Sequence, residues 1–174
     1  MKVNLAHGAG GETMGELLRT LTNVKNRNAG GIGLEALDDG AVIPVDGKNV
    51  VFTTDSHVVR PIFFPGGDIG RLSICGTVND LSMVGANPSH LSLSLIIEEG
   101  FSSELLKKIV SSIRETAEQA GVNIVTGDTK VVEHGAADQL FINTSGIGWI
   151  RPGINLSGVN AKPGDKILLS GYLG

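Results

Sequence analysis

The pattern of hydrophobic and polar positions predicts three helices. Apolar residues recur at helical spacing after Gly11, across a long stretch from Asp68 to about Val84, and again after Ser103, the expected N-cap of the third helix. The second helix carries apolar residues on nearly opposite faces, so we expect it to be buried on most sides. The apolar positions are Met14, Leu17, Leu18 and Leu21 in the first helix, Ile69, Leu72, Ile74, Val78, Leu81 and Met83 in the second, and Leu105, Ile109, Ile113 and Ala117 in the third.

Runs with a period of two predict the strands. From Ser89 to Glu98, leucine and isoleucine alternate with serine over most of the run. The runs Ala41–Val45 and Val50–Thr54 flank the sequence DGKN, which indicates a hairpin. Further strands are predicted at 123–126, from 139 to about 150, and at 166–170, while the polar, glycine-rich stretch from about 22 to 38 is predicted to be mobile. The irregular alternation favours an α+β fold, in which a mixed or antiparallel sheet is layered with helices.

Composition narrows the function classes. The 174 residues suffice for one sizeable domain, and 14 basic against 18 acidic residues give a net charge of −4, which argues against nucleic-acid or anionic-membrane partners. No apolar run approaches the roughly 20 residues that span a bilayer, and no signal peptide is evident, so we expect a cytoplasmic protein. The single cysteine, Cys75, excludes an internal disulfide and a multi-thiolate metal site. The 25 glycines cluster at loops and indicate backbone shaped around a ligand.

Four aspartates are the candidate metal ligands. Asp39 precedes a predicted strand, Asp55 and Asp128 end two others, and Asp80 lies on a polar stripe of the second helix. Strand ends on one side of a sheet converge, so we expect these carboxylates to share a pocket, where they repel unless a cation neutralises them. Oxygen ligands without a cysteine or histidine cluster favour Mg²⁺, which usually accompanies phosphate. The alternative is that each carboxylate is structural and is satisfied by an arginine or by backbone amides.

A bound phosphate also needs hydrogen-bond donors. The candidates are the glycine-rich loop before the first helix, the Pro65–Gly67 loop before the second, and Lys130. Neither a GxxxxGK[ST] nor a GxGxxG motif is present, so spacing alone does not select one loop. The four histidines are scattered, and His134 is the one candidate among them because it follows Lys130 by four residues in a polar loop.

Several long strings together resemble the HypE family of hydrogenase-maturation proteins, within the PurM-like superfamily typified by aminoimidazole ribonucleotide synthase. The likeness covers nearly the whole chain and rests on HGAGGETM, FTTDS, FFPGGDIGRLSICGTVNDLSMVGANP, IIEEG, VTGDTKVVEHGAAD and LFINTSGIG. The resemblance implies two α+β domains. Residues 1–160 match the first, an ATP- and Mg²⁺-binding domain that dimerises through a β-barrel shared with its twin. Residues 161–174 match the start of the second, which is otherwise absent.

The resemblance also implies an activity and partners. Family members use ATP to dehydrate a thiocarboxamide on a C-terminal cysteine to a thiocyanate, the source of the cyanide ligand of nickel–iron hydrogenases. The carbamoyltransferase HypF loads the carbamoyl group, and the HypC–HypD complex assembles the iron ligands. The C-terminal cysteine is missing here, so we expect this fragment to be inactive alone. Two rivals remain, another ATP-dependent kinase or synthase of the superfamily and a non-catalytic dimerisation module.

Site residues follow from the resemblance and from the loops described above. The acidic positions that hold Mg²⁺ and triphosphate match Asp39, Asp55, Asp80 and Asp128. Lys130 either neutralises the transferred phosphoryl group or assists proton removal, and it is a catalytic candidate together with His134. The residues expected to contact the nucleotide are Asn79, Thr129, Lys130, Gly66, Gly67 and Gly127.

Overall fold

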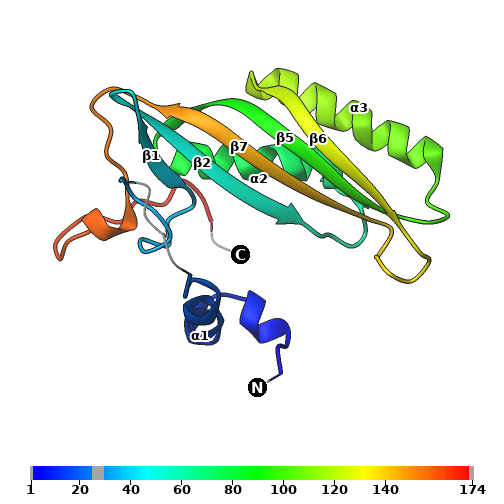
Figure 1. The fold of residues 1–174 in the computed structure, drawn as a ribbon, viewed down its shortest axis with the longest axis horizontal. Helices are drawn as coiled ribbons and strands as arrows, with labels where there is room; N and C mark the ends of the chain where they lie inside the picture. The colour runs from blue at the N-terminus through cyan, green and yellow to red at the C-terminus, as the bar shows by residue number, and fades with distance from the viewer. Residues whose placement is uncertain (1, 25–29, 173–174) are drawn as a thin grey trace.

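A computed structural model, which describes residues 2–24 and 30–172, contains a five-stranded mixed sheet with two long helices across one face (Figure 1). The strand order is β1-β2-β7-β5-β6, and every pairing is antiparallel except the parallel pair β5–β6. This confirms the predicted mixed sheet layered with helices. The strands are β1 (Ala41–Val45), β2 (Lys48–His57), β5 (Ala86–Glu98), β6 (Asn123–Val132) and β7 (Leu140–Ile150).

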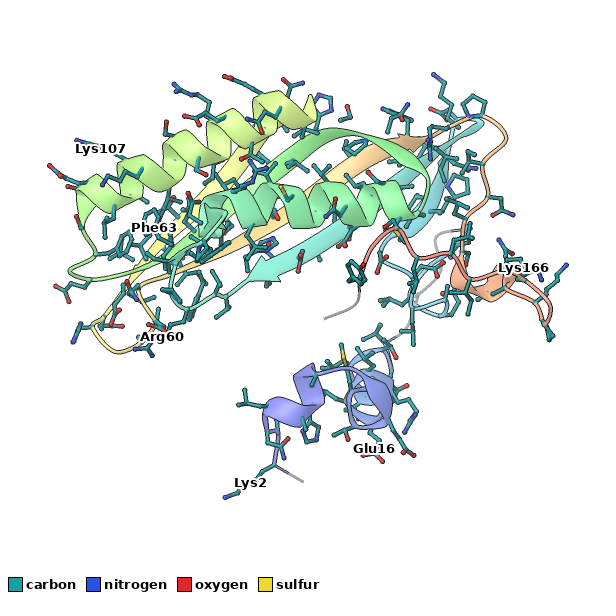
Figure 2. The ribbon with its side chains drawn as sticks, turned by 180° about the vertical axis from the view of Figure 1, so that it is seen from behind. Lys2, Glu16, Arg60, Phe63, Lys107 and Lys166 are labelled. Atoms are coloured by element: carbon teal, nitrogen blue, oxygen red, sulfur yellow. The ribbon has the colours of Figure 1, made fainter. Side chains whose placement is uncertain are left out.

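The helices and small elements complete the described chain. Seen from behind, α2 and α3 lie over the same side of the sheet (Figure 2). A short hairpin, β3 (Phe63–Phe64) with β4 (Gly67–Asp68), leads into α2. The helical elements are η1 (Leu5–Gly8), α1 (Gly11–Leu21), α2 (Ile69–Met83), α3 (Ser103–Ala120) and η2 (Gly158–Asn160). None of the helices within the described ranges is long and apolar enough to cross a membrane.

The core lies between α2, α3 and the covered face of the sheet. Side chains of β7 alternate, so that Leu140 and Ile142 point into this core. A Cβ atom at Gly146 would lie 2.8 Å from both Leu91 Cδ2 and Thr77 Cγ2, so a glycine there lets α2 approach the sheet closely. The alternation predicted for β5 is also confirmed, because Leu91 is buried and Leu93, Leu95 and Ile97 pack against the same core.

Two details of the predicted helices are wrong. Leu72 and Met83 of α2 are 36% and 64% exposed, because only one side of the helix meets the sheet, so α2 is not buried on most sides. The N-cap of α3 is Ser102, whose side chain accepts the amide of Leu105, and not Ser103. The apolar stripe of α3 is confirmed, with Ile109 fully buried.

Three strand predictions also need correction. Strand β6 runs to Val132 instead of stopping at residue 126, because Gly127 continues the pairing with β5, where a Cβ atom would collide with the carbonyl oxygen of Leu93. Strand β2 continues past Asp55 to His57. Residues 166–170 form no strand in the structure, since no neighbouring strand pairs with them. Of the predicted mobile stretch 22–38, residues 25–29 lie outside the described residues.

Candidate functional site

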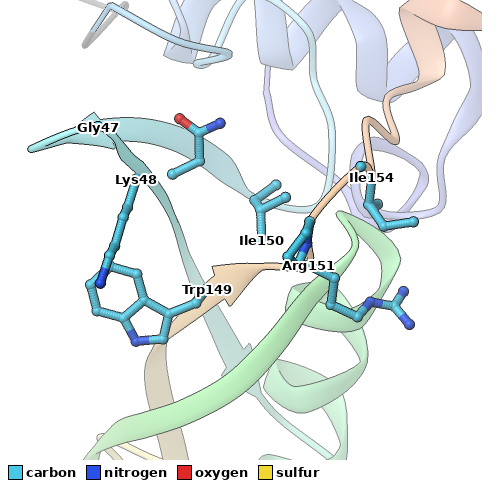
Figure 3. A pocket seen from close by; sticks show the side chains of 9 residues that line it. Gly47, Lys48, Trp149, Ile150, Arg151 and Ile154 are labelled. Atoms are coloured by element: carbon cyan, nitrogen blue, oxygen red, sulfur yellow. The ribbon is translucent and has the colours of Figure 1, made fainter.

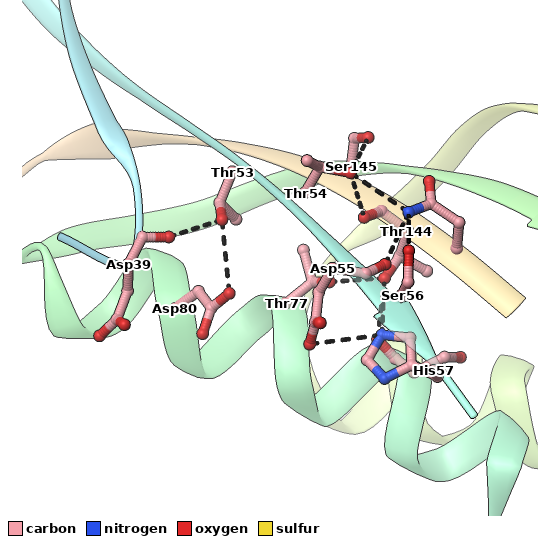
Figure 4. A network of polar contacts seen from close by, with 12 residues as sticks. Asp39, Thr53, Thr54, Asp55, Ser56, His57, Thr77, Asp80, Thr144 and Ser145 are labelled. Atoms are coloured by element: carbon pink, nitrogen blue, oxygen red, sulfur yellow. Dashed lines mark hydrogen bonds and ion pairs between the residues drawn. The ribbon is translucent and has the colours of Figure 1, made fainter. Parts of the chain in front are cut away.

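Three of the four predicted metal ligands gather between α2 and strand β2. Asp80 lies on α2, Asp55 within β2, and Asp39 in the turn before β1 (Figure 4). The Thr53 hydroxyl joins two of these positions, because its oxygen lies 2.6 Å from the backbone oxygen of Asp39 and 3.4 Å from Asp80 Oδ2. Asp55 is therefore brought to the cluster from inside a strand, and not from a strand end as predicted.

The negative charge of this cluster is largely uncompensated. Burial, followed by the nearby charges of Asp55 and Asp39, raises the pKa of Asp80 above its ordinary value, and the Thr53 hydrogen bond only partly opposes this. Within the described residues, no lysine or arginine forms an ion pair with these three carboxylates. The alternative that each carboxylate has its own arginine does not hold for this cluster.

A buried polar network adjoins the cluster at Asp55. His57 Nε2 lies 3.1 Å from Thr144 Oγ1 and 3.6 Å from Asp55 Oδ2. The Thr144 and Thr77 hydroxyls lie 2.5 Å apart, and Thr144 also donates to the backbone oxygen of Ser73. Burial lowers the pKa of His57, while the charge of Asp55 acts in the opposite direction.

Sequence reasoning missed this role of His57, although a signal was present. Val51, Thr53, Asp55 and His57 follow one another at intervals of two, so all four belong to the same face of β2. Val51 is fully buried, and the fourth residue of such a series is expected to be covered as well. Spacing between histidines does not reveal this position, because none of the four pairs at metal-ligand spacing.

Asp128 does not join the other three aspartates within one chain. It lies on β6, the edge strand, which β7 and β5 separate from β2. Its partner is Lys130, whose Nζ lies 3.7 Å from Asp128 Oδ2, and both side chains are exposed. The predicted pocket of four carboxylates is thus wrong for a single chain, because β6 continues through Asp128 at the far edge of the sheet. Thr129 and Gly127 share this strand.

The ligand set is also incomplete as a metal cage. Among residues 2–24 and 30–172, no three histidine, cysteine or acidic side chains converge closely enough to hold a metal ion. The three clustered carboxylates are near enough to perturb one another but do not enclose a site by themselves. A cation here would need oxygen ligands in addition to these three carboxylates.

The remaining predicted residues lie in separate places. Gly66 and Gly67 precede the N-terminus of α2, whose Gly70 and Arg71 amides donate to the side chain of Asp68. Asp80 is near the other end of that helix, about 16 Å along its axis for 11 residues. Asn79 is adjacent to Asp80 on α2. The structure therefore places Asn79, which is exposed, next to Asp80 in the helix and leaves Gly66 and Gly67 at the opposite end.

His134 lies in the exposed loop between β6 and β7. Its Nδ1 is 3.3 Å from Glu98 Oε1. Glu98 also accepts the amides of Gly135 and Gln139, at 2.6 and 3.0 Å, and these two bonds are the main reason that its pKa is lowered, with His134 adding to the effect. The loop that carries His134 is thus held to the end of β5 by one carboxylate.

Among the cavities of the described residues, two lie beside strands β1 and β2. One of about 540 Å³ lies at the β1–β2 turn, where Lys48 Nζ stands 5.8 Å from the ring centroid of Trp149 (Figure 3), and none of the predicted site residues lines it. The other, of about 440 Å³, includes Asp39 and is otherwise mostly apolar. The second cavity is therefore continuous with the acidic cluster.

Comparison with known proteins agrees with the fold. The family model described as "AIR synthase related protein, N-terminal domain" matches residues 37–150, which include β1, β2, α2 and all the acidic positions above. The chain belongs to this family. The carbamoyl dehydratase HypE of Azotobacter vinelandii is 49% identical over 99% of this chain and 50% of its own length. The chain spans about half the length of the curated relatives it matches.

Solved structures give the same result. The crystal structure of a HypE–HypF complex matches with a TM-score of 0.76 and 51% identity, over 88% of this chain and 47% of that one. A crystal structure of HypE in complex with ATP matches with a TM-score of 0.66 and 45% identity, over 94% of this chain and 48% of that one. The resemblance to HypE proteins drawn from the sequence is confirmed.

Proposed function

We propose that this chain is the ATP- and Mg²⁺-binding half of a carbamoyl dehydratase that acts in hydrogenase maturation. The observation that carries the proposal is the uncompensated cluster of Asp39, Asp55 and Asp80, in a chain nearly half identical to carbamoyl dehydratase HypE along almost its full length. In this proposal residues 1–160 form one domain and residues 161–174 begin the next. The strong exposure of Ile167 and Leu168, 91% and 89%, supports this, since such side chains usually pack against further protein.

The donor set of the cluster fits Mg²⁺. Carboxylate oxygens are the ligands that Mg²⁺ prefers, and a divalent ion removes the repulsion that raises the pKa of Asp80. Asp39, Asp55 and Asp80 would each supply oxygen, with nucleotide phosphates and water in the remaining positions. Bound Mg²⁺–ATP would supply an electrophilic γ-phosphoryl group. Its transfer to the thiocarboxamide oxygen, with ADP as the leaving group, would turn a poor leaving group into phosphate.

Lys130 and His134 have separate tasks in this proposal. The ammonium of Lys130 extends from an exposed strand and is suited to the charge of the transferred phosphoryl group. His134 is held by Glu98, and an imidazole paired with a carboxylate is an arrangement suited to proton transfer. The whole enzyme also needs the C-terminal cysteine, HypF to load it, and the HypC–HypD complex to receive the product.

A second copy of the chain is the proposed partner of β6. Every residue of this edge strand except Val132 is exposed, including the apolar Val125 and Val131 at 60% and 69%. An exposed apolar edge strand is a template for pairing with another chain. We propose that two copies meet here to form a closed barrel. This would carry Asp128, Thr129 and Lys130 of one copy to the acidic cluster of the other.

Calorimetry on this chain tests the nucleotide site. Mg²⁺–ATP is titrated into wild type, into Asp80→Asn, and into Asp138→Asn, a matched change at an exposed aspartate paired with Arg60. We expect Asp80→Asn to weaken binding more than about tenfold and the control to stay within about threefold. Absence of binding to wild type would favour the rival, a dimerisation module without nucleotide.

A further inference from the structure

The side chain of His57 occupies a buried position between the sheet and α2, directly beside Asp55. The residue is only 5% exposed. Its Nε2 lies within reach of two oxygens, Thr144 Oγ1 at 3.1 Å and Asp55 Oδ2 at 3.6 Å (Figure 4). In the tautomer that carries its proton on Nε2, the Thr144 hydroxyl accepts from Nε2 and can donate its own proton to the backbone oxygen of Ser73.

Gly76 provides the space in which the two side chains meet. A Cβ atom at this position would lie 2.7 Å from His57 Cε1 and 2.9 Å from Asp55 Oδ2. The imidazole and the carboxylate therefore both pack against the backbone of α2 at Gly76. The Asp55 side chain is 38% exposed whereas that of His57 is 4% exposed, so the imidazole closes one side of the carboxylate and solvent reaches the other.

We infer that His57 is a positioning residue for Asp55. Its Nε2–H faces Asp55 Oδ2 and is shared with Thr144, while packing over Gly76 fixes the plane of the ring. The carboxylate is thereby held in one rotamer, and its Oδ1 is the oxygen left for a cation. Ordering the carboxylate before the cation arrives saves the entropy of fixing it during binding. This role rests on the proposed Mg²⁺–ATP site at Asp55.

Three variants separate positioning from packing. His57→Leu removes the N–H but keeps an apolar side chain, whereas His57→Gln keeps an N–H donor close to the place of Nε2. Thr144→Val removes the other acceptor and leaves the His57–Asp55 contact in place. Two quantities are measured on each: the three-bond couplings of the Asp55 β-protons by NMR in the metal-free protein, and Mg²⁺–ATP affinity by calorimetry.

Distinct outcomes are expected for the three. His57→Leu averages the Asp55 couplings and weakens Mg²⁺–ATP binding more than about tenfold, while His57→Gln stays within about threefold of wild type. Thr144→Val lowers the melting temperature but preserves both the couplings and the affinity. Wild-type Asp55 couplings in His57→Leu would overturn the inference, as would losses of affinity that follow melting temperature across all three variants.

The test remains decisive in two difficult cases. If wild type does not bind Mg²⁺–ATP, the proposed function fails, while the Asp55 couplings still decide the role of His57. If His57→Leu does not fold, Gly76→Ala replaces it, because the added methyl displaces both side chains without removing the N–H. Unchanged Asp55 couplings in Gly76→Ala would then overturn the inference.

Discussion

Asp55 and Asp128 lie in similar short sequences, Thr54-Asp55-Ser56 and Gly127-Asp128-Thr129, yet their surroundings differ completely. Asp55 is in a strand with neighbours on both sides, beside two further carboxylates and a buried imidazole. Asp128 is on an edge strand and has a lysine of its own. The first carboxylate belongs to a cluster that lacks compensating charge, whereas the second belongs to a pair that is already balanced. Position in the sheet, and not the local motif, determines which of the two lacks a compensating charge.

This difference in charge balance explains why the Asp55 cluster of one copy and the Asp128–Lys130 pair of another are proposed to contribute to one site. A balanced, exposed pair gains little within its own chain, since surface ion pairs contribute only about 0–1 kcal/mol. In the proposed dimer the same pair would gain a role, because β6 would meet a second copy and Lys130 would approach bound phosphate. The unbalanced cluster on α2 and β2 would hold the cation, and the balanced pair would come from the partner.

The largest expected effect is the recovery of Mg²⁺–ATP binding when two weakly binding variants are mixed. Asp55→Asn and Asp128→Asn are each expected to bind Mg²⁺–ATP poorly as homodimers. After subunit exchange, half of the molecules are mixed dimers in which one site of two is intact, so about a quarter of all sites recover. Calorimetric stoichiometry measures this fraction.

The control for this mixing experiment uses two residues of the same cluster. Asp55→Asn mixed with Asp80→Asn restores nothing, because every site in the mixed dimer contains one altered carboxylate. Recovery in this control, or no recovery in the first mixture although light scattering shows dimers, would contradict the assignment of Asp128 to the partner's site.

Much of the fold was predictable because one side of each central element is buried. The alternation in β5 and the apolar stripe of α3 appear in the sequence since the covered and exposed faces demand different residues. Strand β6 is exposed on both faces, so its sequence carries no alternation, and Gly127 resembles a strand end in the sequence. A strand with one buried face shows alternating apolar and polar residues in its sequence. An edge strand with both faces exposed shows no such alternation, so its bounds are hard to predict.

The candidate site was predictable only in part for a related reason. Asp39, Asp55 and Asp80 were identified by residue type, but their convergence depends on the register between β2 and α2. The prediction that Asp128 joins them depends on the convergence of strand ends, whereas both Asp55 and Asp128 lie inside their strands. Residue type indicates possible chemistry, and pairing order decides which residues meet.

The dependence of the melting temperature on pH should distinguish the cluster around Asp80 from the Asp128–Lys130 pair in the metal-free protein. At pH 7, Asp80→Asn is expected to raise the melting temperature, by less than about 4 °C since Asp80 is partly exposed and solvent screens its charge. The folded protein raises the pKa of Asp80 above 3.8, so this repulsion is present above the folded pKa, fades as pH falls through it, and is absent below the unfolded value. Thermal melts with a chelator, from neutrality to about pH 3, measure the difference between variant and wild type.

Each variant must be compared with wild type at the same pH, because the titration of His57 changes stability with pH in the direction opposite to that of Asp80. Its pKa is lowered, so the stability it contributes is present above 6.5 and is lost as pH falls through its folded value. The matched variant Asp128→Asn should show no stabilisation at pH 7, since it removes the acidic member of a balanced pair. A less stable Asp80→Asn at pH 7 would instead mark Asp80 as a satisfied structural residue.

The smallest effect concerns the loop that follows β6. Glu98→Gln removes the charge that strengthens the bonds from the Gly135 and Gln139 amides, so both amides should exchange with solvent faster, while the global melting temperature stays within about 2 °C. Hydrogen-exchange NMR measures this, with Glu99→Gln at the adjacent exposed position as the control.

The loop adjoins the strand that carries Asp128 and Lys130. The change lies far from the Asp55 cluster along the sheet, so the Asp55 couplings should remain those of wild type. Unchanged exchange at Gly135 would show that the carboxylate does not hold the loop, and altered Asp55 couplings would show that the two regions are not independent within one chain.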